Sequence, residues 1–396
     1  MLAPPAGPSP LQVEDAPREG PLVERSVSLK PSRGPENNPR LASRMPELDG
    51  LRAIAVLLVL VYHFFVRSPV LAPDYLRGLR TGFTLGWSGV DLFLVLSGFL
   101  IGGTLVDARR SASYFKTFYA RRVFRIFPLY YLFFFCCLAY LFVKPQSSAI
   151  PLWSYAIFAQ NLFIAATGDY GLWWMSPTWS LAVEEQFYLL APLFIRFLPA
   201  RVLTVLLSAL VVLAPVFRSR QAIRGQYVLL HCRADALALG ILIALLVRND
   251  KAWRWLARNR HSLNMTLAIG AVAMAWLTIY LLRHEDSAFG YSFIALFYGC
   301  VLLKAVVQPE GLSGRIFRAK VLQRIGRLSF FIYVVHQAVV GIICAIAFGN
   351  RAIVPSPGAS FALIAVAVAV IWVLSELSWR YFEGPLIKRA HARHSY

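Results

Sequence analysis

Residues 48–64 read LDGLRAIAVLLVLVYHF, an almost unbroken apolar run with an arginine near one end and a histidine near the other. Arg52 and His63 are eleven positions apart, and eleven helical steps of about 100° return to within roughly 20° of the same face. The two side chains are then separated by about 16 Å along the axis. Ionisable groups in a membrane helix usually face a bundle interior or a cavity, so this face is a candidate polar site. The alternative is an interfacial arginine and a core histidine bonded to a neighbouring carbonyl group.

The composition of the chain is that of a membrane protein. Hydrophobic residues make up 58% of the 396 residues and charged residues only 15%, with a mean hydropathy of +0.58. Soluble domains are about one-quarter charged. The sequence therefore predicts an all-α, polytopic membrane helix bundle that contacts the lipid bilayer and has no room for a large soluble domain.

The formal net charge of +20 does not require a nucleic-acid partner, because cytoplasmic loops of membrane proteins are enriched in Lys and Arg. The five cysteines lie mostly in apolar segments without C-x-x-C spacing, which favours packing roles over a redox or zinc site. No pair of histidines has the spacing of a metal site. We therefore expect neither nucleic acid nor a metal ion among the partners.

Ten apolar segments have about the 20 residues that a bilayer core requires. They are residues 48–66, 86–106, 126–143, 178–196, 202–218, 228–247, 262–282, 289–307, 327–348 and 359–381. The connections on one side of this bundle, which include the predicted loop 107–125, carry most of the Lys and Arg, and the positive-inside rule makes that side cytoplasmic. We expect a multi-pass protein of the bacterial inner membrane with both termini in the cytoplasm.

The segments outside the predicted spans are short. Residues 1–45 are rich in Pro, Ser, Glu and Arg and lack a sustained apolar run, which predicts a disordered cytoplasmic tail. The membrane domain covers residues 46–387, and residues 388–396 form a short basic cytoplasmic tail. Residues 151–166 are apolar but contain two amide side chains, and a span there would place the basic loops outside. We interpret them as an interfacial or re-entrant helix.

Carboxylates lie near the start of two predicted spans. Asp91 begins the second span, and Glu184 and Glu185 lie a turn or two inside the fourth. Charges in a membrane interior are costly and usually face a cavity or a partner. The alternative for Asp91 is an acid favoured by the helix dipole, and the alternative for Glu184 is a structural hydrogen-bonding role.

Two arginines precede the third span. Arg122 and Arg125 are three residues apart, so on a helix they would face the same way. Paired guanidinium groups suit phosphate binding. The alternative is a positive-inside anchor, which is the commoner meaning of such a cluster.

Polar residues also interrupt two later spans. Arg233 and Asp235 lie in the sixth span, where we expect them to pair with each other inside the bundle. His336 lies near the middle of the ninth span. We expect it to pack or to form a hydrogen bond, although it could also titrate.

The chain resembles the integral membrane acyltransferase family 3, which includes polysaccharide O-acetylases and macrolide O-acylases. The resemblance runs from about Leu48 to Glu383 and rests on motifs whose order and spacing together are specific. These are Arg52-x10-His63, residues 89–93 and 97–99, Arg122-x-x-Arg125 before residues 126–128, residues 179–181 with Glu184, residues 187–188, Arg233-x-Asp235, residues 326–336 and Glu383-x-Pro385. Some members carry a fused periplasmic hydrolase-like domain, and this chain resembles the stand-alone form.

The resemblance implies an O-acyltransferase that moves an acyl group from cytoplasmic acyl-CoA to a hydroxyl group, commonly of a carbohydrate or glycoconjugate. Acetyl-CoA is the default donor. In the predicted topology Arg52, Arg122 and Arg125 lie at the inner end of the bundle, where they would bind the phosphates of CoA. His63 lies toward the outer end, where it would act as general base on the acceptor hydroxyl.

Asp91 or Glu184 is expected to complete this site by fixing the tautomer of His63. A covalent acyl-histidine is the alternative to general-base catalysis. An alternative of another class is a membrane transporter or flippase for a glycoconjugate or lipid, which would also explain buried charges. That alternative predicts an inverted repeat, and none is visible in the sequence.

Overall fold

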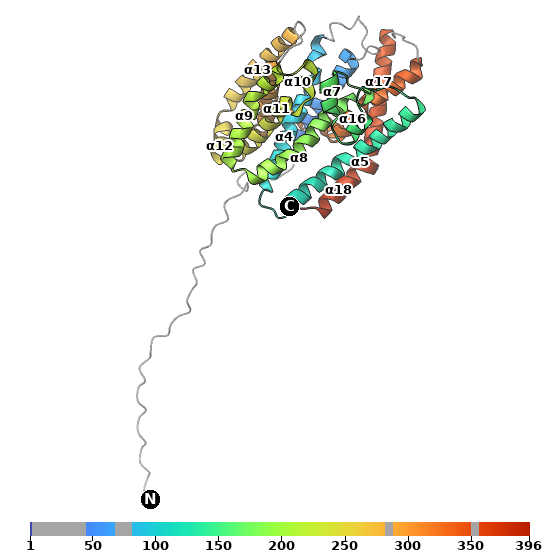
Figure 1. Cartoon of the computed structure of the whole chain (residues 1–396). Helices are drawn as coiled ribbons and strands as arrows, with labels where there is room; N and C mark the ends of the chain where they lie inside the picture. The colour runs from blue at the N-terminus through green and yellow to red at the C-terminus, as the bar shows by residue number, and fades with distance from the viewer. Residues whose placement is uncertain (2–44, 68–80, 282–287, 350–355) are drawn as a thin grey trace. The chain divides into compact units, whose positions relative to one another are not determined.

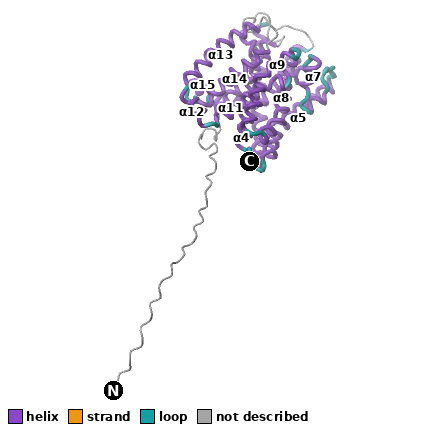
Figure 2. The backbone as a smooth tube through the Cα atoms, turned by 60° about the vertical axis from the view of Figure 1, so that its left-hand side comes forward, coloured by secondary structure: helices purple, strands orange, loops and turns teal. Residues whose placement is uncertain are grey.

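The structure is a computed structural model that describes Met1 and residues 45–67, 81–281, 288–349 and 356–396. Nearly all of the predicted tail of residues 1–45 lies outside these residues. All regular secondary structure in the described part of the chain is helical (Figure 2). This confirms the prediction of an all-α helix bundle.

The order of the helices along the chain can be followed in Figure 1. Ten long helices are α2 (Pro46–Tyr62), α4 (Gly89–Asp107), α5 (Tyr114–Val143), α8 (Trp179–Phe197), α9 (Ala200–Ser219), α11 (Leu230–Val247), α13 (Arg260–Leu281), α14 (Ala288–Val307), α16 (Lys320–Phe348) and α17 (Pro357–Ser378). The shorter elements are η2 (His63–Arg67), η4 (Thr84–Ser88), α6 (Leu152–Ala156), α7 (Gln160–Thr167), η5 (Trp173–Thr178), α10 (Ile223–Val228), α12 (Asp250–Arg258), α15 (Leu312–Phe317), η6 (Trp379–Glu383) and α18 (Gly384–Arg393).

Each predicted span overlaps one of the ten long helices. Within the described residues, nine helical segments are long and apolar enough to cross a membrane. The tenth, α8, is 19 residues long but carries Glu184, Glu185 and Arg196, which lower its apolar character. The side chains of α13 are mostly exposed and include Met265 and Trp276. Such an apolar surface is compatible with lipid and costly in water.

Close helix packing forms the centre of the bundle. Helix α4 packs on α11, and α2 packs on α16. A Cβ atom on Gly98 of α4 would lie 2.1 Å from the Leu237 carbonyl oxygen of α11, and one on Gly326 of α16 would lie 1.8 Å from the Asp49 carbonyl oxygen of α2. Small residues of this kind let backbones approach within a membrane. The first contact joins the helices that carry Asp91 and Arg233, and the second joins α2 to the helix that carries His336.

Two connecting segments differ from a simple loop. The prediction that residues 107–125 form a loop is wrong from Tyr114 onward. Helix α5 begins at that residue and contains both Arg122 and Arg125. Residues 151–166 form the two short helices α6 and α7, with Phe158 between them at φ 55°. Neither helix is long enough to cross a bilayer, in agreement with the interpretation of this segment as non-crossing.

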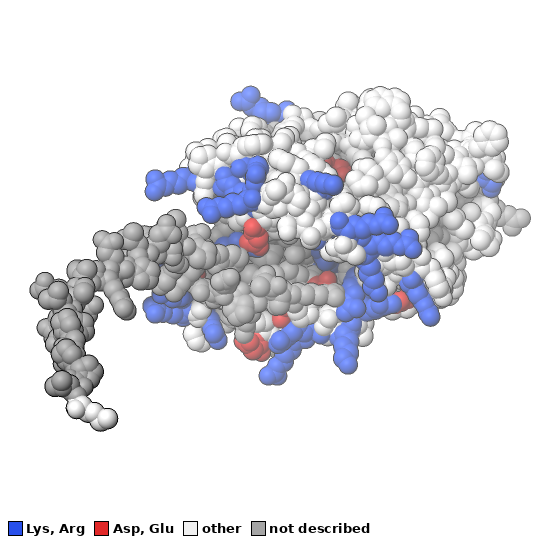
Figure 3. Space-filling view, turned by 90° about the horizontal axis from the view of Figure 1, so that it is seen from below, with Lys and Arg blue, Asp and Glu red and all other residues white. Residues whose placement is uncertain are grey.

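The C-terminal tail lies against the start of α5. The hydroxyl groups of Ser113 and Thr117 donate to the carbonyl oxygen of Ser395 at 2.9 and 3.0 Å. Arg121 donates to the carbonyl oxygen of His394. The C-terminus and the connection before α5 are therefore on one face of the helical bundle, and Lys and Arg side chains gather on that face (Figure 3).

Candidate active site

Two cavities in the described part of the chain are lined by the predicted site residues other than Asp91. The larger, of about 1060 Å³, is lined by His63 and by residues of η2, η4, η5, α10, α14 and α16. The smaller, of about 110 Å³, is lined by Arg52, Arg122 and Arg125 together with Glu184. Tyr333 of α16 lines both cavities. The predicted histidine and the predicted arginines thus lie in adjoining spaces.

His63 begins η2, directly after α2, and contacts a second histidine on α16. Its Nδ1 lies 2.9 Å from the carbonyl oxygen of Val59 and 3.2 Å from Nε2 of His336. Nδ1 of His336 lies 2.8 Å from the carbonyl oxygen of Tyr333. His336 is fully buried, whereas His63 is partly exposed to the larger cavity.

These partners determine where the protons of the neutral rings lie. A carbonyl oxygen only accepts, so Val59 requires a proton on Nδ1 of His63, and Tyr333 requires one on Nδ1 of His336. The Nδ1–H of His63 is then shared between two acceptors, the Val59 carbonyl oxygen and Nε2 of His336. Nε2 of His63 keeps a free lone pair and has no hydrogen-bond partner among the described residues. It is therefore the nitrogen of this pair that can accept a proton in the larger cavity.

The three predicted arginines come together from α2 and α5. Nη1 of Arg52 lies 3.2 Å from Oδ1 of Asp49, which neutralises part of its charge. The guanidinium of Arg122 lies 5.6 Å from the ring centre of Tyr188, and its Nε has no hydrogen-bond partner among the described residues. Three guanidinium groups around one small space, with one buried donor free, form a candidate site for phosphate groups.

Glu184 lies with these arginines and not with His63. Its Oε2 accepts from the hydroxyl group of Tyr188 at 2.7 Å and from that of Ser97 at 3.5 Å. The expectation that Glu184 fixes the tautomer of His63 is therefore wrong. The reason is the position of Glu184 on α8, a little more than one turn after Trp179. Trp179 lines the larger cavity beside His63, whereas Glu184 lines the smaller cavity.

Asp91 is also directed away from His63. It forms an ion pair with Arg233 of α11, and both side chains are buried. This carboxylate faces α11 because it lies on the opposite face of α4 from α2. The expected contact of Asp91 with His63 is absent, and the Val59 carbonyl group and His336 occupy the position assigned to it.

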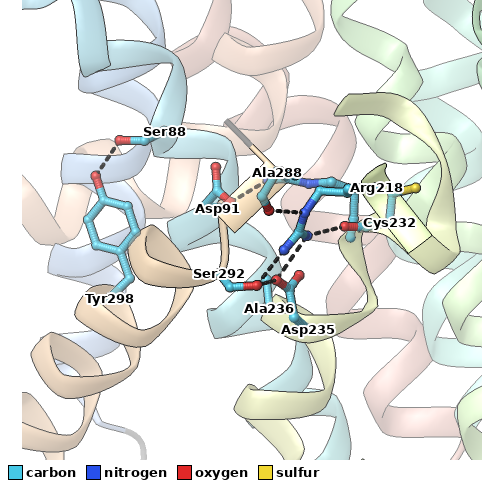
Figure 4. Close-up of polar contacts among 10 residues, drawn as sticks. Ser88, Asp91, Arg218, Cys232, Asp235, Ala236, Ala288, Ser292 and Tyr298 are labelled. Carbon is cyan, nitrogen blue, oxygen red and sulfur yellow. Dashed lines mark hydrogen bonds and ion pairs between the residues drawn. The ribbon is translucent and has the colours of Figure 1, made fainter. Parts of the chain in front are cut away.

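The buried ion pairs also correct the pairing expected within α11. Asp235 pairs with Arg218 at the end of α9, at 3.0 Å, and not with Arg233 (Figure 4). Arg218 is fully buried and also donates to the carbonyl oxygen of Ala288 at 2.6 Å, while Ser292 donates to Asp235 at 2.6 Å. This network joins α9, α11 and α14, and we interpret it as structural.

Two contributions to the site are not evident from the sequence. His336 was expected to pack or to form a hydrogen bond, and it does form hydrogen bonds, but its partner His63 was not foreseen. Tyr333 forms a wall between the cavities, where its hydroxyl group contacts Ser180 and donates to the carbonyl oxygen of Pro177 at 2.9 Å. The available signal was the spacing of Tyr333 and His336, which places both on one face of α16.

Comparison with known proteins gives the family. The profile of the acyltransferase 3 family, described as an acyltransferase domain, matches residues 45–376. The chain belongs to this family. It is 27% identical to the putative peptidoglycan O-acetyltransferase YrhL of Bacillus subtilis over 86% of its own length and 55% of that protein.

Two further relatives have similar names. Identity is 27% to the peptidoglycan O-acetyltransferase OatA of Listeria monocytogenes, over 87% of this chain and 56% of that protein. It is 25% to the O-acetyltransferase OatA of Staphylococcus aureus, over 87% of this chain and 57% of that protein. The chain thus spans about half the length of the curated relatives it matches. No solved structure matches it.

Proposed function

We propose that this membrane acyltransferase transfers an acyl group from acyl-CoA to a hydroxyl group of a carbohydrate or glycoconjugate. The observation that carries the proposal is the free Nε2 of His63 in a large cavity that adjoins a cluster of three arginines. A base and a phosphate-binding cluster, separated by one tyrosine, match the two substrates of such a reaction. The three relatives are named as O-acetyltransferases, and two of these names specify peptidoglycan. The names support acetyl as the transferred group and a carbohydrate as the acceptor.

The reaction is a single displacement at the thioester. Nε2 of His63 removes the proton of the acceptor hydroxyl, and the oxygen attacks the thioester carbonyl carbon. The carbon–sulfur bond breaks, CoA leaves as a thiolate, and the imidazolium returns the proton to that sulfur. His336 and the Val59 carbonyl group hold the imidazole in the tautomer that exposes Nε2. A covalent acyl-histidine formed on the same nitrogen is the alternative route.

The arginines serve the donor. Arg52, Arg122 and Arg125 bind the phosphates of CoA, and the thioester extends past Tyr333 toward His63. The excess of Lys and Arg in the connections on the arginine side supports a cytoplasmic position for that side. Acyl-CoA then arrives from the cytoplasm, and the acceptor enters the larger cavity from the opposite face of the membrane.

The test is acyl transfer by the purified full chain in lipid nanodiscs. The protein is incubated with isotopically labelled acetyl-CoA and oligosaccharide acceptors, and the products are analysed by mass spectrometry. His63→Ala should lower the rate by about 10²–10⁴-fold, the usual contribution of a general base. His231→Ala is the matched control, because His231 is exposed on α11 and lines neither cavity.

Two outcomes would contradict the proposal. Wild-type turnover by a folded His63→Ala variant would exclude His63 as the base. Movement of a glycoconjugate across the membrane without acyl transfer, in liposomes containing the wild-type protein, would favour the transporter alternative.

A further inference from the structure

The larger cavity has an aromatic wall. The rings of Trp87, Trp179, Tyr227 and Tyr291 line it, with ring centres 4.5 Å apart for Trp179 and Tyr227 and 5.3 Å apart for Trp87 and Tyr291. Ligand sites typically combine such walls with a few placed polar groups. Flat aromatic faces pack well against the carbon–hydrogen faces of a sugar ring. The polar groups then determine which sugar is held.

Two arginines form the cationic part of the same cavity. Arg67 ends η2 and Arg224 lies on α10, and both are exposed. The guanidinium of Arg224 lies 5.0 Å from the ring centre of Tyr170, and neither arginine pairs with a carboxylate in the part of the chain that the structure describes. Asp169 is the acidic residue among the described residues lining the cavity, and one of its oxygens accepts from the Gly171 amide at 2.8 Å.

These two arginines are not needed for the donor. The CoA phosphates are assigned to Arg52, Arg122 and Arg125, which line the smaller cavity on the other side of Tyr333. Neither Arg67 nor Arg224 lines that cavity. A second cationic site beside the base therefore calls for a second anion, and the acceptor is the substrate that enters there.

We propose that Arg67 and Arg224 bind an anionic group, a carboxylate or a phosphate, on the acceptor glycan. This inference rests on the proposed function. Arg67 follows His63 by four residues in the five-residue π-helix η2, so the two residues lie within about one helical turn of each other. The anion is thus held about one helical turn from the base. The hydroxyl that is acylated belongs to the sugar that bears the anion or to its neighbour.

The test compares matched acceptors that differ in one ionised group. They are the neutral N-acetylglucosamine trisaccharide, the same trisaccharide oxidised to a carboxylate at its reducing end, and the same trisaccharide with a reducing-end phosphate. Binding to the full chain in zwitterionic nanodiscs is followed by tryptophan fluorescence, because Trp87 and Trp179 line the cavity. Acyl transfer is measured separately by mass spectrometry. The variants are Arg67→Gln and Arg224→Gln, with Arg220→Gln as control, since Arg220 is exposed nearby and lines neither cavity.

We expect the wild type to bind at least one anionic trisaccharide about ten-fold or more tightly than the neutral one, as a charge-assisted contact allows. The carboxylate and phosphate arms show which anion is preferred. This ratio should fall toward one in Arg67→Gln and Arg224→Gln and stay at the wild-type value in Arg220→Gln.

Equal binding of all three trisaccharides by the wild type would overturn the inference, and so would a preference that survives in both variants. If anionic lipid in the nanodiscs abolishes the preference, the arginines bind headgroups and the inference fails. If the protein transfers acyl groups equally well to neutral and anionic acceptors, the proposed function holds and the inference of an anion site fails. Selective binding of the anionic sugar without transfer would uphold the anion site and count against the proposed function.

Discussion

Replacing His336 by phenylalanine tests whether this ring acts through His63. The substitution fills the fully buried position but removes Nε2, which lies 3.2 Å from Nδ1 of His63. The Val59 carbonyl group remains as a partner. One hydrogen bond contributes about 0.5–1.5 kcal/mol net, which corresponds to roughly a two- to twelve-fold change in rate. We expect kcat for acyl transfer to fall by about that factor, with KM for acetyl-CoA little changed.

The decisive measurement is a double-mutant cycle with His63→Ala. Transfer from labelled acetyl-CoA is followed for the wild type, both single variants and the double variant, with the thermal unfolding midpoint as a check on folding. If His336 only orients His63, His336→Phe has almost no further effect once the His63 imidazole is gone. Equal fold losses in both backgrounds would refute this reasoning and give His336 a role of its own.

Other consequences of the structure can be measured independently. Arg122→Gln and Arg125→Gln should each raise KM for acetyl-CoA by roughly ten-fold or more with a smaller change in kcat, because phosphate contacts exist in the ground state and the transition state alike. A lower kcat at unchanged KM would instead place these two arginines at the reacting carbonyl group. Asp235→Ala should destabilise the bundle by about 3–5 kcal/mol, since it leaves a buried arginine unpaired, and a thermal unfolding midpoint like that of the wild type would contradict the buried pair. In a cysteine-free background, Ala112→Cys should react with an impermeant thiol reagent only after permeabilisation and Thr167→Cys in intact cells, and the reverse pattern would invert the proposed orientation.

The long helices were predictable because each has the length and apolar character that a bilayer requires. Apolar character does not predict where a helix ends once the helix extends beyond the apolar residues. Helix α5 continues back to Tyr114 through residues that include Arg121, Arg122 and Arg125. A count of basic residues treats such a segment as a cytoplasmic loop, although an amphipathic turn at the membrane surface has the same composition. The boundary was therefore misplaced while the span itself was correct.

The candidate site was predictable in its components and not in its pairings. The face shared by Arg52 and His63 follows from helical periodicity alone. The contact of His63 with His336 joins residues 273 positions apart, and it depends on the close approach of α2 and α16 at Gly326. The partners of Asp91 and Glu184 depend on the rotation of α4 and α8 about their axes. Periodicity gives the relative positions of side chains on one helix, but the neighbouring helix decides which of them meet.

Tyr333, which lines both cavities, also has an electrical consequence. Elsewhere the membrane potential falls across about 30 Å of hydrocarbon, but where water fills both cavities it would fall mainly across the protein between them, which includes Tyr333. An elementary charge that crosses the full potential gains or loses about 2.3 kcal/mol per 100 mV. A neutral acetyl group passes without that cost, whereas acetate would not. Under the proposed function, a cell would acylate molecules outside its membrane without moving net charge across it.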